Sequence, residues 1–262
     1  MDVAGAAWAT VISQGLSFIM GIIYFRRKKH VVTFSLKDIC FDGKLAKELI
    51  SNGLPSAGQQ VSVHFSNLCM TGMANSFGLV SAAAYGIAVK LDSFAILPCS
   101  AVNDAVASFA AQNLGADKEE RALASAKDGR KLALIYVCIV FAVIFFFGGR
   151  LAAIFTKETD VIYTASMYLK IACFMYFMYA SVYPLQGFLK GSGNSGFVLI
   201  NSLIVQYIIK IPTAYLLSHV VGIGINGIAF TWILTPIFST VTYTHYIKKG
   251  KWRKGFNMPE KK

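Results

Sequence analysis

The chain has 262 residues and a net charge of +12; it is 55% hydrophobic, only 15% charged, and has a mean hydropathy of +0.55. Soluble globular domains usually carry about 25% charged residues, so this chain has too few charges to cover a surface that faces water. The composition excludes an ordinary soluble domain and indicates an integral membrane protein.

Apolar residues lie in seven long blocks that are separated by short polar connections. Most blocks reach or exceed the roughly 20 residues that a helix needs to cross the hydrocarbon core of a bilayer. The sequence therefore predicts an all-α polytopic membrane protein with seven transmembrane helices. In chain order the blocks are Val3–Phe25, Val61–Phe77, Leu79–Ala111, Leu132–Phe155, Val161–Leu189, Phe197–Val221 and Ile223–Ile247.

Neither end of the first block carries a processing signal, and the cysteines form no pattern. The basic cluster follows the first block instead of preceding it, so no cleavable signal peptide is expected. Four of the five cysteines lie inside apolar blocks and no C-x-x-C occurs. We expect small packing residues, with no metal site and no disulfide framework, at Cys40, Cys69, Cys99, Cys138 and Cys173.

Lysines and arginines gather in alternate connections between the blocks. They occupy the stretches 26–47 and 118–131, position Lys190 and the tail 248–262, whereas the other connections hold only Lys157, with Arg150 near a helix end. This alternation follows the positive-inside rule. It predicts a multi-pass protein of the cell membrane with cytoplasmic basic loops, a cytoplasmic C-terminus and Met1 outside. Anionic lipid headgroups explain the positive charge, and no nucleic-acid partner is expected.

The first block resembles the last one. When the chain is aligned with itself so that Gly5 meets Gly227, Ser17 meets Ser239 and basic pairs coincide after both blocks. Transporters are often built from repeats of this kind. We interpret the chain as the C-terminal part of a longer transporter, with the missing first lobe supplied in cis or in trans. The predicted parts are a first-lobe helix at 1–25, a basic cytoplasmic linker at 26–53, a six-helix second lobe at 54–247 and a basic cytoplasmic tail at 248–262.

Four motifs along the chain carry a family resemblance. Gln112-Asn113-Leu114-Gly115-Ala116, followed by Arg121-Ala122, resembles the Q-N-x-G-A…R-A signature of the multidrug and toxic compound extrusion (MATE) family. Three more stretches are similar to family motifs in the same order: Ala84-Tyr85 with Lys90 to Phe94, Phe155-Thr156, and Leu185 to Gly193. The resemblance covers about the whole chain and implies the second lobe plus the last helix of the first.

The last of these motifs overlaps a pattern that occurs in nucleotide-binding sites. The stretch Lys190-Gly191-Ser192-Gly193-Asn194-Ser195-Gly196 includes G-x-G-x-x-G, which can cradle a pyrophosphate between a strand and a helix. Here an aromatic helix precedes it instead of a strand, so no nucleotide site is expected. We interpret the stretch as a tight turn between two helices, in which Gly191 and Gly193 allow the chain to reverse.

Polar residues recur on one face of several apolar blocks. Such residues are costly in hydrocarbon unless they face a cavity or each other. A cavity with tyrosine and methionine walls would suit varied organic cations. Ser/Thr stripes can instead mediate packing between helices, and we favour this packing role for the stripe of Thr231, Thr235, Ser239 and Thr242. The candidate lining residues are Gln60, Asn67, Thr71, Tyr85, Lys90, Tyr176, Tyr179, Gln206 and Lys210.

Asp92 lies about midway along the third block and is the first candidate for ion coupling. It would bind H⁺ or Na⁺, or a cationic substrate; the alternative is a standing ion pair, with Lys210 the more plausible partner. His64 is a second candidate, and Asp104, near the cytoplasmic end, is a third for which a solvated or capping role is favoured. Many MATE proteins carry E-L-x-x-R where this chain has Gln206 and Lys210, which leaves the coupling ion open.

The resemblance implies a secondary-active antiporter that exports cationic, amphipathic compounds in exchange for H⁺ or Na⁺ by alternating access, without a further cofactor. Two alternatives stay open. Lys90, Lys170 and Lys210 would suit a lipid-linked oligosaccharide flippase of the same superfamily, and the chain could instead be a half-length subunit that needs a separate first lobe. The sequence has no H-E-x-x-H, G-x-S-x-G or Walker A motif, so we expect no enzyme.

Overall fold

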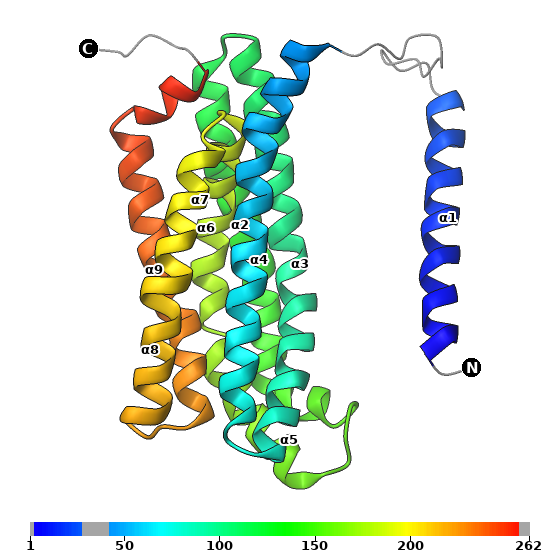
Figure 1. Cartoon of the computed structure of the whole chain (residues 1–262), viewed down its shortest axis with the longest axis vertical. Helices are drawn as coiled ribbons and strands as arrows, with labels where there is room; N and C mark the ends of the chain where they lie inside the picture. The colour runs from blue at the N-terminus through cyan, green and yellow to red at the C-terminus, as the bar shows by residue number, and fades with distance from the viewer. Residues whose placement is uncertain (1–2, 28–41, 257–262) are drawn as a thin grey trace. The chain divides into compact units, whose positions relative to one another are not determined.

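The computed structural model describes residues 3–27 and 42–256, and every regular element in these ranges is a helix (Figure 1). The chain divides into two units, Met1–Ala46 and Lys47–Lys262. Cys40, residues 28–41 of the predicted linker and residues 257–262 of the predicted tail lie outside the described ranges. The last part of the predicted linker, from Gly43, is already helical because α2 begins there.

Helix α1 (Val3–Arg27) accounts for the first apolar block. Its large apolar side chains are exposed within its unit, among them Trp8, Phe18 and Met20. Residues Ala7–Tyr24 are long and apolar enough to cross a membrane. A helix that exposes apolar residues all round requires a covering of lipid or protein, so this helix is suited to the bilayer and not to water.

The second unit is a bundle of long helices joined by short turns (Figure 1). Its central helix α6 packs against α3, α4 and α9. Helices α5 and α6 follow each other with a bend of 50° between them. The elements are α2 (Gly43–Asn75), α3 (Leu79–Gly115), α4 (Glu119–Ala152), α5 (Thr159–Ala172), α6 (Met175–Gly191), α7 (Ser195–Leu203), the π-helix η2 (Ile204–Lys210), α8 (Ile211–Tyr215), the π-helix η3 (Leu216–Val220), α9 (Ile225–Lys248) and the 3₁₀-helix η4 (Lys251–Phe256).

The described helices confirm a polytopic membrane protein. Five helical stretches are long and apolar enough to span a bilayer, and the count rises to six if the bent pair of α5 and α6 is one span. The remaining block of the seven lies in α2, which is 33 residues long but is not among these spans. Its middle carries Gln59, Gln60, His64 and Asn67, and these polar side chains lower its hydropathy. The seventh span therefore stays a prediction.

Two glycines of α6 allow it to approach α3 very closely. A Cβ atom added at Gly187 would overlap the backbone carbonyl of Asn103, and one added at Gly191 would overlap the carbonyl of Ala107. Small residues four apart are a common device for bringing two membrane helices into backbone contact. This contact fixes α3 and α6 to each other, and both helices line the cavity of the second unit.

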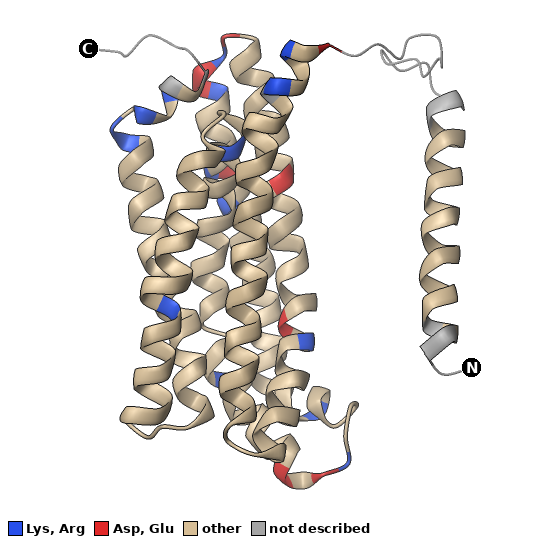
Figure 2. Cartoon of the chain, viewed as in Figure 1, with Lys and Arg blue, Asp and Glu red and all other residues tan. Residues whose placement is uncertain are grey.

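Charged residues of the second unit lie mainly at the two ends of its helices, whereas the middle is almost free of them (Figure 2). Placing a charge at the centre of a bilayer is costly. Two of the exceptions are Asp92, in the span Leu79–Gly115, and Lys210, in the span Ser195–Val220. Both line the same cavity.

Candidate functional site

A cavity of about 440 Å³ lies inside the second unit, between α2, α3, α6, α7, η2 and α9. Helix α2 reaches the opposite wall through side chains: Lys190 Nζ donates to Gln59 Oε1 at 3.1 Å, and Lys210 Nζ donates to Asn67 Oδ1 at 2.9 Å. The volume falls within the 300–1,000 Å³ range of small-molecule sites. The arrangement can therefore enclose a drug-sized molecule between α2 and the rest of the bundle.

The structure brings most of the predicted site residues together. Three candidates on α2 line one side, because residues at steps of four and three share a helical face. Five more come from α3, α6 and η2. The residues of the predicted set that line the cavity are Gln60, His64, Asn67, Asp92, Asp104, Tyr179, Gln206 and Lys210.

Four other candidates lie outside the cavity lining. Thr71 is exposed and its hydroxyl donates to the Asn67 carbonyl at 3.0 Å. Tyr85 is buried edge-on against Tyr168, with ring centroids 5.7 Å apart. Lys90 is exposed and lies 5.8 Å from the centre of the Phe155 ring. Tyr176 is also buried, and its hydroxyl donates a hydrogen bond to Asp92 of the cavity lining.

Asp92 is held on the cavity wall by one hydrogen bond. Its side chain is 8% exposed, and its carboxylate accepts a hydrogen bond from the Tyr176 hydroxyl. Among the described residues, neither Lys90 nor Lys210 forms an ion pair with it, since the ion pairs there are Lys131 with Asp128 and Arg253 with Glu119. The alternative of a standing ion pair is therefore not the arrangement in this structure, and the carboxylate is available to a ligand.

Lys210 is one of two lysines that line the cavity. It is 1% exposed, and its ammonium lies 3.6 Å from the centre of the Trp232 ring. It ends the π-helix η2, and Pro212 follows two residues later. Proline has no N–H to donate to the preceding turn, and π-helical turns often occur at functional sites. The widened turn accompanies the inward placement of the Lys210 side chain.

Several cavity residues were not predicted from the sequence: Gln59, Lys190, Asn201, Trp232 and Tyr243. The sequence predicts Lys190 in a connection between two spans, but the residue is part-buried at the end of α6. Asn201 joins α7 to α9, because it donates to Ser239 Oγ at 3.2 Å and accepts from Thr242 Oγ1 at 2.7 Å. These bonds favour the packing interpretation for that end of the last block, although Ser239 also lines the cavity.

The signature around Gln112 forms the end of α3. Asn113 Nδ2 donates to the Phe109 carbonyl at 2.7 Å, and its own carbonyl accepts from the backbone N–H of Lys118 at 2.8 Å. Gln112 Nε2 lies 3.4 Å from Ser108 Oγ, and Gly115 is the last residue of the helix. The motif closes a helix and turns the chain into α4, away from the cavity.

The G-x-G-x-x-G stretch joins α6 to α7. Gly191 ends α6 against α3, and Gly193 has a φ of +76° in the turn. Only glycine adopts such a backbone conformation freely. The structure thus places a helix–helix turn where the sequence predicted one.

Comparison with known proteins identifies the family. The model of the MatE family matches residues 55–216. The protein named "Probable multidrug resistance protein YpnP" of Bacillus subtilis (strain 168) is 28% identical over 97% of this chain and 56% of its own length. Another from the same organism, "Probable multidrug resistance protein YoeA", is 26% identical over 90% of this chain and 51% of its own.

A solved structure shows the same fold. A multidrug resistance MATE family transporter of the MOP superfamily, in an outward-facing conformation, matches with a TM-score of 0.85 at 19% identity, over 95% of this chain and 57% of its own. The chain spans about half the length of the curated relatives it matches. Since the family model covers more than half of the sequence, this chain belongs to the MatE family of transporters.

Proposed function

We propose that this chain is the second lobe, with the last helix of the first lobe, of an antiporter that exports cationic, amphipathic compounds in exchange for H⁺ or Na⁺ by alternating access. The relatives named as probable multidrug resistance proteins support a role of the whole protein in resistance to drugs. Because the chain spans about half of their length, the activity would require a first lobe supplied in cis or in trans. A half-length subunit with a separate partner is the trans form of this proposal.

The observation that carries the proposal is the position of Asp92. Its carboxylate lies in an apolar span, on the wall of a cavity, with Tyr176 as its hydrogen-bond donor and without an ion pair among the described residues. A buried charge without a counter-charge is costly. A proton, Na⁺ or an organic cation can each supply that charge, and only one can occupy the carboxylate at a time. This competition would make release of the substrate depend on arrival of the ion.

The cavity walls suit a flat organic cation. Tyr179 and Tyr183 lie with ring centroids 5.5 Å apart, and Met175 and Trp232 line the same space. Aromatic faces attract cations, and methionine adapts to varied shapes. His64 and Asp104, both exposed on the cavity lining, are further candidate proton or cation sites. The proposal needs no cofactor beyond the coupling ion.

The proposed orientation follows the basic residues. Placing residues 118–131 at the start of α4, Lys190 and the C-terminus in the cytoplasm of a cell-membrane protein satisfies the positive-inside rule. Partners would then be the lipid bilayer, the first lobe and small organic cations. No nucleic acid is required.

Two lysines favour a second candidate function. Lys190 and Lys210 line the cavity, and cations facing a cavity would suit the phosphate groups of a lipid-linked oligosaccharide. Lys90 and Lys170, which also suggested this function from the sequence, are exposed and do not line the cavity. A flippase would translocate a fluorescent lipid-linked oligosaccharide in vesicles and leave organic cations behind.

The test joins this chain to a MatE first lobe and reconstitutes the product in vesicles with an imposed pH or Na⁺ gradient. Asp92→Asn is expected to abolish gradient-driven efflux of ethidium, because the neutral amide cannot exchange one cation for another. Asp160→Asn, at an exposed position in the first turn of α5, is the matched control and is expected to transport normally. Unchanged, gradient-dependent efflux by Asp92→Asn would show that the coupling site lies elsewhere.

A further inference from the structure

The chain folds back on itself after α9. The 3₁₀-helix η4 places Trp252 in the bundle with 1% of its surface exposed, edge-on to Phe188 of α6 with ring centroids 5.1 Å apart. Trp252 packs there in one apolar cluster with Val198 of α7 and Tyr243 of α9. A tryptophan buried to this extent contributes strongly to packing. The segment is therefore part of the folded unit.

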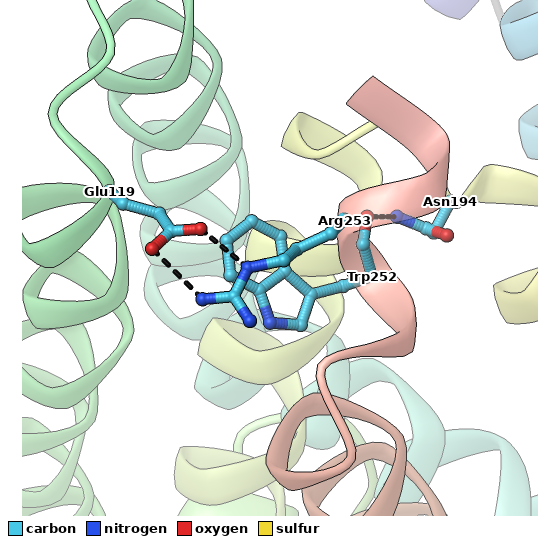
Figure 3. A network of polar contacts seen from close by, with 4 residues as sticks. All are labelled: Glu119, Asn194, Trp252 and Arg253. Atoms are coloured by element: carbon cyan, nitrogen blue, oxygen red, sulfur yellow. Dashed lines mark hydrogen bonds and ion pairs between the residues drawn. The ribbon is translucent and has the colours of Figure 1, made fainter. Parts of the chain in front are cut away.

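One asparagine of the G-x-G-x-x-G turn binds this segment (Figure 3). Asn194 Nδ2 donates to the Trp252 backbone carbonyl at 2.7 Å, and Asn194 Oδ1 accepts from the Tyr246 hydroxyl at 3.0 Å. The same Nδ2 also lies 3.0 Å from the Ser192 carbonyl. A single buried amide thus joins the α6–α7 turn to both α9 and η4.

Two glycines bring the turn and the segment into backbone contact. A Cβ atom at Gly193 would lie 2.6 Å from the Gly255 carbonyl oxygen, and a Cβ at Gly255 would clash with the Ser192 carbonyl. A backbone atom cannot swing aside as a side chain can. The glycines of this turn therefore fit the approach of a second backbone, and in this protein that backbone is its own C-terminal segment.

An ion pair holds the segment from the other side (Figure 3). Arg253 Nε lies 2.6 Å from Glu119 Oε1, and a second guanidinium nitrogen lies 2.9 Å from Oε2. Both side chains are largely covered, at 14% and 19% exposure. Paired, parallel bonds of this kind are among the strongest that side chains make. Hydrogen bonding to Glu119 raises the pKa of Arg253 above its ordinary value.

We propose that residues 251–256 form a latch, defined by Trp252, Arg253 and Gly255, and that the G-x-G-x-x-G turn is its receptor. The latch joins the start of α4, at Glu119, to the α6–α7 turn, at Asn194, and Asn194 also binds the end of α9 through Tyr246. In other folds the glycines of this pattern contact a phosphate, whereas here the turn contacts the backbone of η4 at Gly255.

The latch also fixes one end of the cavity. Lys190 lies four residues before Asn194, and Tyr243 lies three before Tyr246. The Phe197 ring stacks on Tyr246 with centroids 3.9 Å apart and contacts Tyr243 at 6.1 Å. Lys190 and Tyr243 both line the cavity. Arg253 and Glu119 are therefore positioning residues for that end of the site, through contacts that exist without any ligand.

The test uses the 262-residue chain in lipid nanodiscs without ligand, so its outcome is independent of the proposed transport activity. Hydrogen exchange is measured by mass spectrometry over residues 190–197, together with Lys-C cleavage after Lys251 and Lys254. Loss of a hydrogen bond to a charged group corresponds to about a tenfold change in an opening equilibrium. We expect Glu119→Gln and Arg253→Gln each to raise exchange in the turn and cleavage of the tail about tenfold.

Two further variants separate the latch from a general loss of structure. Asp128→Asn removes an exposed ion pair with Lys131 on the same helix as Glu119, and it is expected to change neither measurement. The swapped pair, Glu119→Arg with Arg253→Glu, is expected to return both toward the wild type, because the contact is restored with reversed polarity. Turn exchange within about twofold of the wild type in either single variant would overturn the proposal. A swapped pair as open as the single variants would overturn it as well.

Discussion

The Lys210 ammonium lies 3.6 Å from the centre of the Trp232 ring, and it reaches this position from the end of a π-helix. The sequence predicts Lys210 as a residue of the cavity lining, whereas no sequence pattern pointed to Trp232. Their contact shows how the site compensates a buried cation with an aromatic face and the Asn67 amide in place of a carboxylate.

The contribution of this contact can be measured with a double-mutant cycle. We expect Trp232→Leu to lower the free energy of unfolding more in the wild type than in Lys210→Met, with a difference of about 1–2 kcal/mol from the lost cation–π interaction. Methionine keeps the length of the side chain and removes its charge. SDS titration of the chain in mixed micelles provides the unfolding free energies. Purely additive losses would mean that the ring only fills space.

A second prediction concerns the hydrogen bond between Tyr176 and Asp92. Tyr176→Phe is expected to lower the unfolding free energy by about 1.5–3 kcal/mol, since the bond is made to a buried carboxylate. In the background of Asp92→Leu the same substitution should cost almost nothing, because the partner is gone. Tyr163→Phe, at a 69% exposed position, is the control. Equal costs in both backgrounds, read from the same SDS titration, would assign the effect to packing of the ring.

The polar stripe of α2 was predictable because helical periodicity states which residues share a face. Gln60, His64 and Asn67 do line one cavity. Periodicity does not state what covers that face, and this is why Tyr85 proved to be packed against Tyr168. The sequence order of residues likewise carries no information on tertiary neighbours such as Trp232.

Irregular backbone was the other feature that the sequence did not reveal. The bend between α5 and α6 lies at Cys173 and Phe174, where neither proline nor glycine marks it. Pro184 lies well inside α6. The docking of η4 depends on contacts between residues more than fifty positions apart, such as Asn194 with Trp252. Local patterns identify helices and turns, but these contacts form only when the bundle is packed.

Close packing of α6 on α3 gives a third prediction. Gly187→Ala is expected to destabilise the chain by about 1–3 kcal/mol, because the new methyl group would overlap the Asn103 carbonyl and force the helices apart. Gly86→Ala, in α3 with open space around it, is the matched control and should be neutral or stabilising by up to about 1 kcal/mol. Thermal unfolding in detergent distinguishes them. Equal behaviour of both variants would contradict the close helix contact.

The last prediction separates backbone strain from steric fit in the turn that receives η4. Gly193 and Gly222 have nearly the same φ, +76° and +78°, but only Gly193 faces another backbone, that of Gly255. Alanine at either position should cost about 1–2 kcal/mol from the left-handed conformation.

Alanine at Gly193 should in addition displace the C-terminal segment, because its Cβ would lie 2.6 Å from the Gly255 carbonyl oxygen. The positive φ of Gly193 leaves the turn little freedom to relieve this overlap. Lys-C cleavage after Lys251 is therefore expected to rise in Gly193→Ala and to stay at the wild-type rate in Gly222→Ala. If both variants release the tail equally, strain alone controls the turn. If neither does, the turn tolerates a side chain and is not shaped by the segment that lies on it.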